Sequence, residues 1–147
     1  MNIALGSDHG GFELKNTIIT HLKDKGISTI DVGTYSEDSC DYPDFGAAVA
    51  DAVVSGQADF GILICGTGIG ISISANKIDG IRCALLSDVF SAKATRLHND
   101  ANVMAMGARV MGPGLALEIT DAFLSTEFSG EARHQKRINK VMDLEKR

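Results

Sequence analysis

A glycine-rich turn near the middle of the chain limits the folds that this sequence can adopt. Residues 59–65 form a short apolar run, which is typical of a strand buried on both faces of a parallel sheet. Three glycines then alternate with Thr67 and Ile69, and residues 71–77 can continue as a helix. A strand, turn and helix in this order leave backbone N–H groups unpaired at the positive end of the helix. The turn is therefore predicted to hold negative charge, with the thiol of Cys65 at its edge.

Apolar runs alternate with helical patterns along the rest of the chain. Strands are predicted over residues 2–6, 28–32, 59–65, 82–86 and 102–106. Helices are predicted between them, most clearly after Pro43, and a last helix is predicted over residues 132–145. Strands separated by helices of this length imply right-handed crossovers. The expected fold is therefore α/β, a three-layer αβα domain of Rossmann or flavodoxin-like type with a five-stranded parallel sheet and a C-terminal helix. Residues 1–147 are expected to form this single domain.

Charge and composition exclude several functions. The formal net charge of −5 argues against general nucleic-acid binding, which needs a basic surface. No apolar stretch has the length of a membrane span and no basic-then-apolar leader is present, so a cytoplasmic location without membrane contact is expected. Cys40, Cys65 and Cys83 show no Cys-x-x-Cys spacing, which predicts neither a disulfide framework nor a zinc site. Histidines and carboxylates show no ligand spacing either, so neither a metal nor a cofactor is predicted.

The carboxyl ends of the predicted strands bring polar residues to one edge of the sheet, where such sheets bind their ligands. In chain order these residues are Asp8, His9, Cys65 to Gly70, Asp88 and Arg109. His98 and Asn99 end the fourth helix and are expected at the opposite edge. Within one chain they should lie far from Cys65, and a second subunit could bring them back.

Several of these residues also have an ordinary structural interpretation. A cysteine at a strand end is often a small buried apolar residue, as expected for Cys83. Cys65 differs because a helix N-terminus favours the thiolate. Thr67 can cap the following helix, and His21 and His134 are expected to be structural.

The C-terminal helix carries a local positive patch, since six of the fourteen lysines and arginines fall within the last fifteen residues. Arg133 and Arg137 share one face of this helix.

Motifs over nearly the whole chain resemble a sugar-phosphate isomerase family that includes ribose-5-phosphate isomerase B and galactose-6-phosphate isomerase. They are Ser7 to Gly11, Asp41 to Pro43, Ile62 to Gly70, Ala75 to Lys77, Gly80 to Arg82, His98 to Val103 and Gly130 to Arg137. A cysteine followed by Gly-Thr-Gly-Ile-Gly is much more specific than a lone glycine-rich loop. The resemblance implies an aldose–ketose isomerase of the non-oxidative pentose phosphate pathway that interconverts ribose 5-phosphate and ribulose 5-phosphate through an enediolate.

The resemblance also implies roles in proton transfer. Cys65 is the base for the carbon acid, and Thr67 hydrogen-bonds to O1 or O2 of the sugar. His98 opens the sugar ring, with Asp8 as a possible partner. The backbone amides that would hold the enediolate oxygens are those of Gly66, Thr67, Gly68, Ile69 and Gly70. Some members carry a glutamate base just after the third glycine, but this chain has Ile71, so Cys65 is the only base that the loop offers.

Substrate contacts follow from the same resemblance. His9, Arg133 and Arg137 are the implied phosphate ligands, and Tyr42, Asn99 and Arg109 are further implied contacts. The family builds each site from two subunits, so at least a homodimer is expected, and a tetramer is possible.

Other functions fit the sequence less well. A dinucleotide-binding oxidoreductase is disfavoured because Gly66, Gly68 and Gly70 lack the Gly-x-Gly-x-x-Gly spacing, although Asp88 about twenty residues later favours it. A P-loop kinase is excluded by the absence of Gly-Lys-Ser/Thr. A non-catalytic sugar-phosphate-binding module, or one subunit of a hetero-oligomeric isomerase, would not need a carbon-acid base. A hexose 6-phosphate of the allose or galactose type stays open as the substrate, because pocket depth cannot be read from the sequence.

Overall fold

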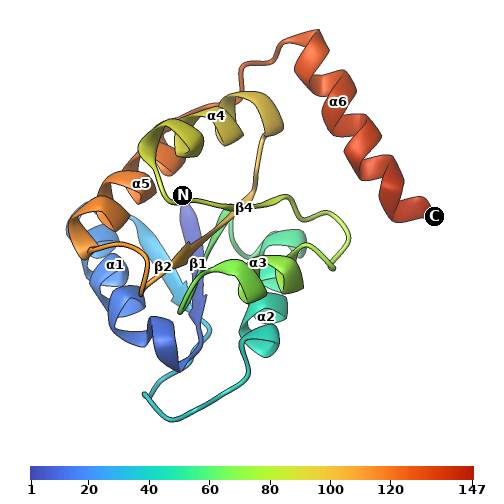
Figure 1. The fold of residues 1–147 in the computed structure, drawn as a ribbon. Coiled ribbons are helices and arrows are strands. Elements are labelled where there is room, and N and C mark those ends of the chain that lie inside the picture. The colour runs from blue at the N-terminus through green and yellow to red at the C-terminus, as the bar shows by residue number, and fades with distance from the viewer.

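Five short apolar segments pair into one parallel sheet in the computed structural model, which describes all of residues 1–147 (Figure 1). The strands are β1 (Asn2–Ser7), β2 (Ser28–Asp31), β3 (Phe60–Cys65), β4 (Cys83–Leu85) and β5 (Val103–Gly107). Their order is β2-β1-β3-β5-β4. The predicted five-stranded parallel sheet is confirmed, and each predicted strand agrees with the observed one within one residue at either end.

The centre of the sheet is the most buried part of the molecule. β3 lies between β1 and β5, where Leu5 pairs with Ile62 and Cys65 pairs with Gly107. From Gly61 onward β3 is buried, as a strand covered on both faces should be. This placement carries the glycine-rich turn to the middle of the carboxyl edge of the sheet.

Helices cover both faces of the sheet and form the three predicted layers (Figure 1). One layer contains α1 (Phe12–Asp24), α4 (Val89–Asn99) and α5 (Pro113–Ser125), whose apolar residues pack with one side of the strands. The other layer contains α2 (Tyr42–Val54) and α3 (Ile69–Ala75). A short 3₁₀ turn, η1 (His9–Gly11), connects β1 to α1. No helix is both long and apolar enough to span a lipid bilayer.

The helix after the glycine-rich turn begins and ends two residues earlier than predicted. α3 ends at Ala75, because the side chain of Asn76 pairs with the backbone of Cys83. Its Nδ2 donates to the Cys83 carbonyl at 2.9 Å, and its Oδ1 accepts from the Cys83 N–H at 2.8 Å. An asparagine used in this way acts as a partner for the edge strand β4, so the chain leaves the helix there.

The last helix stands apart from the three layers, as Figure 1 shows at the upper right. α6 (Ala132–Met142) continues into the 3₁₀ turn η2 (Asp143–Lys146), and both fall at the predicted C-terminal helix. Only His134 and Ile138 of α6 are buried. In η2, Glu145 Oε1 accepts a hydrogen bond from the Gly80 N–H at 2.9 Å, which attaches the C-terminal end to the rest of the domain. The predicted helix is therefore present, but most of its surface is uncovered in this chain.

Candidate active site

The thiol of Cys65 lies at the end of the central strand with a backbone donor directed at it. Cys65 is 5% exposed, and the Gly68 N–H donates to its Sγ at 3.1 Å. α3 has only seven residues, so the nearby amide is a more direct stabiliser of a thiolate than a long helix dipole. Gly68 has φ +77°, a left-handed conformation that glycine adopts without strain and that turns this amide toward the sulfur.

Unpaired backbone donors lie in the turn that follows Cys65. The N–H groups of Gly66, Thr67, Gly70 and Ile71 have no hydrogen-bond partner within the chain. Thr67 uses its hydroxyl oxygen locally, where it accepts from the Ile69 N–H at 3.3 Å. The N-cap of α3 is Gly68, and α3 has no side-chain cap, so Thr67 does not cap the helix as the sequence allowed. Several free donors beside one buried thiol form an arrangement that can hold a developing oxyanion.

Small residues allow other loops to approach this turn closely. A Cβ atom on Gly10 would lie 3.3 Å from the Gly66 nitrogen, and one on Gly107 would lie 2.7 Å from the Thr67 carbonyl oxygen. A Cβ on Gly70 would lie 2.6 Å from Cζ of Tyr42. The loops after β1 and β5 and the ring of Tyr42 therefore touch the glycine-rich turn, as predicted for residues at one sheet edge.

Arg109 brings positive charge to the same turn. Its backbone N–H donates to the Gly66 carbonyl at 3.0 Å. A Cβ placed on Gly66 would lie 3.2 Å from Nη1 of Arg109, so the guanidinium covers this glycine. A cation in this position favours negative charge in the turn beneath it.

Asp8 and His9 reach the same edge from β1, but both already have partners. The Asp8 carboxylate is 8% exposed and accepts from the N–H groups of Gly10 at 2.9 Å and Gly11 at 3.2 Å. His9 Nδ1 accepts from the Cys40 N–H at 3.2 Å. A hollow of about 380 Å³ opens beside His9 and Gly10, but Cys65 is not among its lining residues. This hollow is therefore separate from the thiol.

His98 and Asn99 lie at the opposite edge of the sheet, as predicted. Asn102, just after the end of α4, accepts from the Gly61 N–H at 3.0 Å, near the start of β3. Cys65 is at the other end of the same strand, and four residue steps of a strand span about 13 Å. The candidate residues therefore form two groups in one chain. We call them the thiol group, around Cys65, and the histidine group, around His98.

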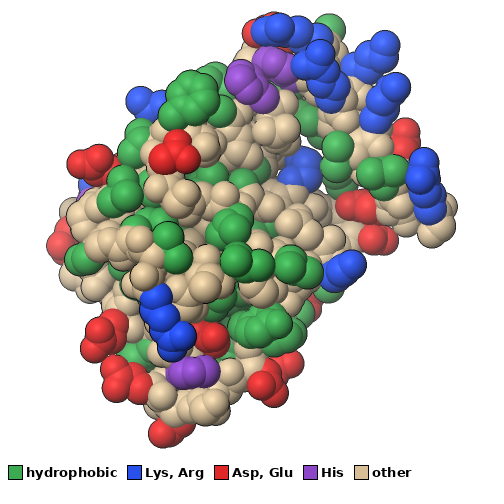
Figure 2. All heavy atoms as spheres, viewed as in Figure 1, with side chains coloured by type: hydrophobic (Ala, Val, Ile, Leu, Met, Phe, Trp, Pro, Cys, Tyr) green, Lys and Arg blue, Asp and Glu red, His purple; other side chains and the backbone are tan.

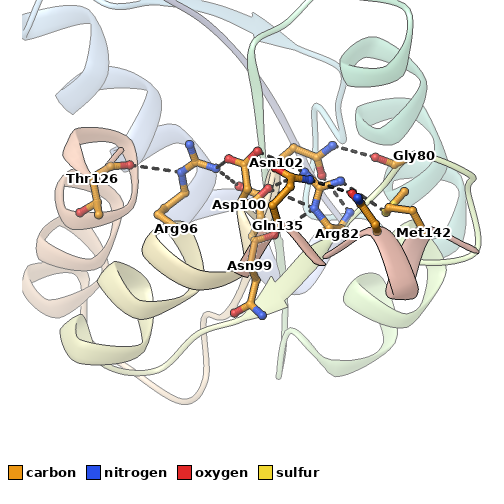
Figure 3. A network of polar contacts seen from close by, with 11 residues as sticks. Gly80, Arg82, Arg96, Asn99, Asp100, Asn102, Thr126, Gln135 and Met142 are labelled. Carbon is orange, nitrogen blue, oxygen red and sulfur yellow. Dashed lines mark hydrogen bonds and ion pairs between the residues drawn. The ribbon is translucent and has the colours of Figure 1, made fainter. Parts of the chain in front are cut away.

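A buried arginine network fixes the end of α4 (Figure 3). Arg96 Nη1 donates to the Asp100 carboxylate at 2.7 Å and to the Ala101 carbonyl at 2.6 Å, and its guanidinium lies over the Phe60 ring at 4.6 Å. Arg82 donates to the Asn99 carbonyl at 3.0 Å and to the Asp100 carbonyl at 2.7 Å. Asp100 adopts φ +46°, so the chain turns sharply just after Asn99. This network was not predicted from the sequence, although Arg82 and Asp100 lie within two of its motifs.

The basic face of α6 adjoins the histidine group. Figure 2 shows Lys and Arg side chains gathered over α6 beside histidine side chains. Four basic residues alone line a hollow of about 300 Å³ on this helix: Arg133, Lys136, Arg137 and Lys140. Arg133 Nε donates to the Glu131 carboxylate at 2.7 Å, and this hydrogen bond lowers the pKa of Glu131. A surface with this many cations suits a phosphate group.

The remaining titratable residues of interest have structural partners. The Asp88 carboxylate accepts from the Ser91 N–H at 2.7 Å, which caps α4 and lowers the pKa of Asp88. Burial raises the pKa of the Cys83 thiol to about 12, so it stays protonated, as expected of a packing residue. His21 Nε2 lies 2.8 Å from the Asp121 carboxylate on α5, which confirms its structural role.

Comparisons with known proteins show what this chain is similar to. A profile described as Ribose/Galactose Isomerase matches residues 3–141. Ribose-5-phosphate isomerase B of Escherichia coli strain K12 is 50% identical over 145 residues, which is 99% of this chain and 97% of that protein. The structure of Clostridium thermocellum ribose-5-phosphate isomerase B is similar with a TM-score of 0.98 at 53% identity, over 99% of this chain and 98% of the other.

A further solved structure is of Mycoplasma genitalium ribose-5-phosphate isomerase B with bound ribulose 5-phosphate. It is similar with a TM-score of 0.93 at 42% identity, over 99% of this chain and 96% of the other. Fold, motifs and full-length identity lead to the same assignment. This chain belongs to the ribose/galactose isomerase family.

Proposed function

We propose that this chain is an aldose–ketose isomerase that interconverts ribose 5-phosphate and ribulose 5-phosphate, with Cys65 as the base. The observation that carries the proposal is the buried Cys65 thiol with the Gly68 N–H directed at its sulfur and unpaired N–H groups in the turn that follows it. Relatives named ribose-5-phosphate isomerase B cover the whole chain, and one of them binds ribulose 5-phosphate.

The chemistry needs a proton to move between two adjacent carbons. In this proposal the Cys65 thiolate removes the proton from C2 of the open-chain aldose and returns it to C1 of the enediolate. The negative charge that develops on O1 and O2 is stabilised by the free amides of the turn and by the Thr67 hydroxyl. Arg109 adds positive charge beside Gly66. No oxidant is required, because the substrate and the product are isomers.

The phosphate and the sugar ring need groups that lie at the other end of the chain. Arg133 and Arg137 on α6 are proposed to bind the phosphate together with His9, and His98 is proposed to open the furanose ring. Tyr42 and Asn99 would contact the sugar. In one chain the length of β3 separates His98 from Cys65, which is more than a pentose phosphate can bridge.

A second copy of this chain is therefore the proposed partner. Apolar side chains on α3 and at the start of α4 are unusually exposed: Phe90 is 80% exposed, Ile73 is 55% exposed and Ile69 is 51% exposed. In the proposed homodimer, this surface is covered by the partner, and the partner's α6 and α4 bring the histidine group to Cys65. Each active site then contains the thiol group of one chain and the histidine group of the other.

Proton NMR in D₂O tests the reaction and its base together. With ribose 5-phosphate, the wild-type protein should exchange the C2 proton and form ribulose 5-phosphate. Cys65→Ala should do neither, with a loss of about 100-fold or more, because a positioned base contributes about that much. Cys83→Ala is the matched control, since its thiol stays protonated, and it should retain both signals. Full activity of Cys65→Ala would show that another group is the base.

A galactose-type hexose phosphate is the second candidate substrate, because the matching family is described as both ribose and galactose isomerases. The same NMR measurement with galactose 6-phosphate and allose 6-phosphate compares them directly. A larger kcat/KM for a hexose 6-phosphate than for ribose 5-phosphate would replace the substrate in this proposal while leaving its mechanism in place.

A further inference from the structure

A buried histidine lies directly against the exposed histidine at the end of α4. His134 is 5% exposed, and the centroid of its ring lies 4.5 Å from that of His98, with an angle of 45° between the two planes. His98 is exposed, and no other residue of this chain hydrogen-bonds to its ring. An exposed imidazole without such bonds has several rotamers available, so the contact with a fixed neighbour restricts it.

Hydrogen bonds through Ser129 hold His134 in place. The Ser129 side-chain oxygen lies 2.8 Å from Nδ1 of His134 and accepts from the Glu131 N–H at 3.3 Å. The Ser129 hydroxyl proton is thus available for Nδ1, and the ring proton of a neutral His134 is assigned to Nε2. The Ser129 N–H donates to the carbonyl of Leu97, the residue just before His98, at 3.2 Å. This backbone bond connects the segment that holds His134 to the turn of α4 that carries His98.

Burial, with the neighbouring cations, favours the neutral form of His134. Burial lowers the pKa of His134, and the positive charges of His98, Arg133 and Arg137 lower it further, while Glu131 opposes them. Arg96 lies in the turn of α4 before His98, with its charge paired to Asp100. A neutral His134 can pack against His98 whether or not His98 carries a proton.

We propose that His134 is a positioning residue that holds the imidazole of His98 in the orientation required to open the sugar ring. This inference rests on the proposed function. His134 is on the same helix as Arg133 and Arg137, one residue from the first and three from the second. The phosphate ligands and the ring-opening group are thus set by one rigid element.

Opening of the sugar ring can be measured separately from proton transfer at carbon. In ring opening the C1–O4 bond breaks, O1 loses its proton and O4 gains one, so atoms and electrons balance without another reactant. Ribulose 5-phosphate has no such ring, because its C5 oxygen is esterified and cannot attack the C2 carbonyl. Exchange of its C1 protons with D₂O therefore needs Cys65 but not His98 or His134.

Two substitutions separate the ring contact from the hydrogen bond. His134→Asn keeps a polar group for Ser129 but removes the ring, while His134→Phe keeps a ring against His98 but removes the bond. We expect His134→Asn to lower the turnover of ribose 5-phosphate by roughly 10- to 100-fold, the range for a misplaced catalytic group. We expect His134→Phe to recover most of it. C1 exchange of ribulose 5-phosphate should stay at the wild-type rate in both variants.

Two further variants complete the experiment. His98→Asn should show the same separation of the two rates, and to a greater extent, while His21→Asn, at the contact with Asp121 on α5, should change neither rate. Equal losses of turnover and exchange in His134→Asn, or unchanged turnover, would overturn the positioning role. If the wild-type protein neither converts ribose 5-phosphate nor exchanges ribulose 5-phosphate, the proposed function fails, and this inference fails with it. If only His98→Asn lacks the separation, the ring-opening assignment is wrong, which also removes the role of His134.

Discussion

The thiol group and the histidine group use different kinds of structure to place their chemistry. Around Cys65, glycines and backbone amides on the central strand do the positioning, and neighbouring loops approach to within van der Waals contact. Around His98, long charged side chains stand on a helix whose surface is mostly uncovered. Backbone groups cannot change rotamer, so they suit the stabilisation of a short-lived oxyanion. Flexible cations tolerate small shifts of a phosphate, which is bound equally before and after the reaction.

The largest effect is expected when the thiol group and the histidine group are inactivated on different chains. Cys65→Ala and His98→Asn should each be inactive on ribose 5-phosphate as homodimers. In a mixed dimer, one site combines the intact Cys65 of one chain with the intact His98 of the other. Random mixing should therefore restore about a quarter of wild-type activity, because half of the dimers are mixed and half of their sites are intact. The measurement is the turnover of the co-refolded mixture.

The control for this mixture carries both substitutions on one chain. Mixed with the wild-type chain, it leaves both sites of every mixed dimer incomplete, so no activity should be gained. If the two single variants remain inactive after verified exchange of subunits, both groups act within one chain and the shared site is wrong.

A methyl group added at Gly70, among the residues around Cys65, should have the next largest effect on activity. In Gly70→Ala the new Cβ would lie 2.6 Å from Cζ of Tyr42, so the tyrosine ring must move. Overpacking of about 1–3 kcal/mol corresponds to a loss of roughly 5- to 100-fold in kcat/KM if it falls on substrate contacts. In Gly114→Ala, at the start of α5, the new Cβ would have no atom within 4 Å, and activity should be unchanged.

A second variant shows whether Tyr42 carries that effect. In a Tyr42→Ala background the added methyl group has space, so Gly70→Ala should then change kcat/KM very little. An undiminished loss in that background would mean that the turn itself is distorted.

The smallest expected effect is on the histidine group. Glu131 holds Arg133 through a hydrogen bond of 2.7 Å, so Glu131→Gln should release the guanidinium for phosphate. KM for the sugar phosphate should fall by about two- to fivefold at unchanged kcat, the size expected for an exposed ion pair. Glu118→Gln makes the same change at an exposed glutamate on α5, so it serves as the control and should leave KM unchanged. A rise in KM would show that Glu131 orients Arg133 for binding.

The stability difference between the wild type and Glu131→Gln should depend on pH in a definite direction. The Arg133 N–H lowers the pKa of Glu131, so the folded carboxyl titrates below its unfolded value of about 4.3. Its stabilising pair with Arg133 is complete above the unfolded pKa and is lost as the pH falls through the folded pKa. The stability difference between the wild type and Glu131→Gln should therefore be constant at neutral pH and disappear in acid, as measured by urea unfolding.

The parts of the fold that follow a local pattern could be predicted, and those set by long-range pairing could not. The apolar run before Cys65 is a local signal, and it has the predicted structure. The position of β5 between β3 and β4 was not predicted. The buried Val103–Gly107 run is consistent with an interior place, but only pairing across the sheet decides it.

The candidate site also has features that could be predicted from the sequence and others that could not. The placement of His98 at the opposite edge from Cys65 followed from the direction of α4, and the structure has it there. The contact between His98 and His134 was missed, because nothing near His134 in the sequence shows that α6 returns to α4. The arginine network was missed for a similar reason, since Arg82 and Asp100 are far apart in sequence.

The placement of Cys65 and His98 at opposite edges of one sheet also bears on when the protein can act. If every reaction centre requires two chains, specific activity obeys mass action and falls when the protein is diluted below the dissociation constant of the pair. A newly synthesised chain would then be silent until it meets a second one. The amount of chain present, and not only the amount of substrate, would set the rate at which sugar phosphates are converted.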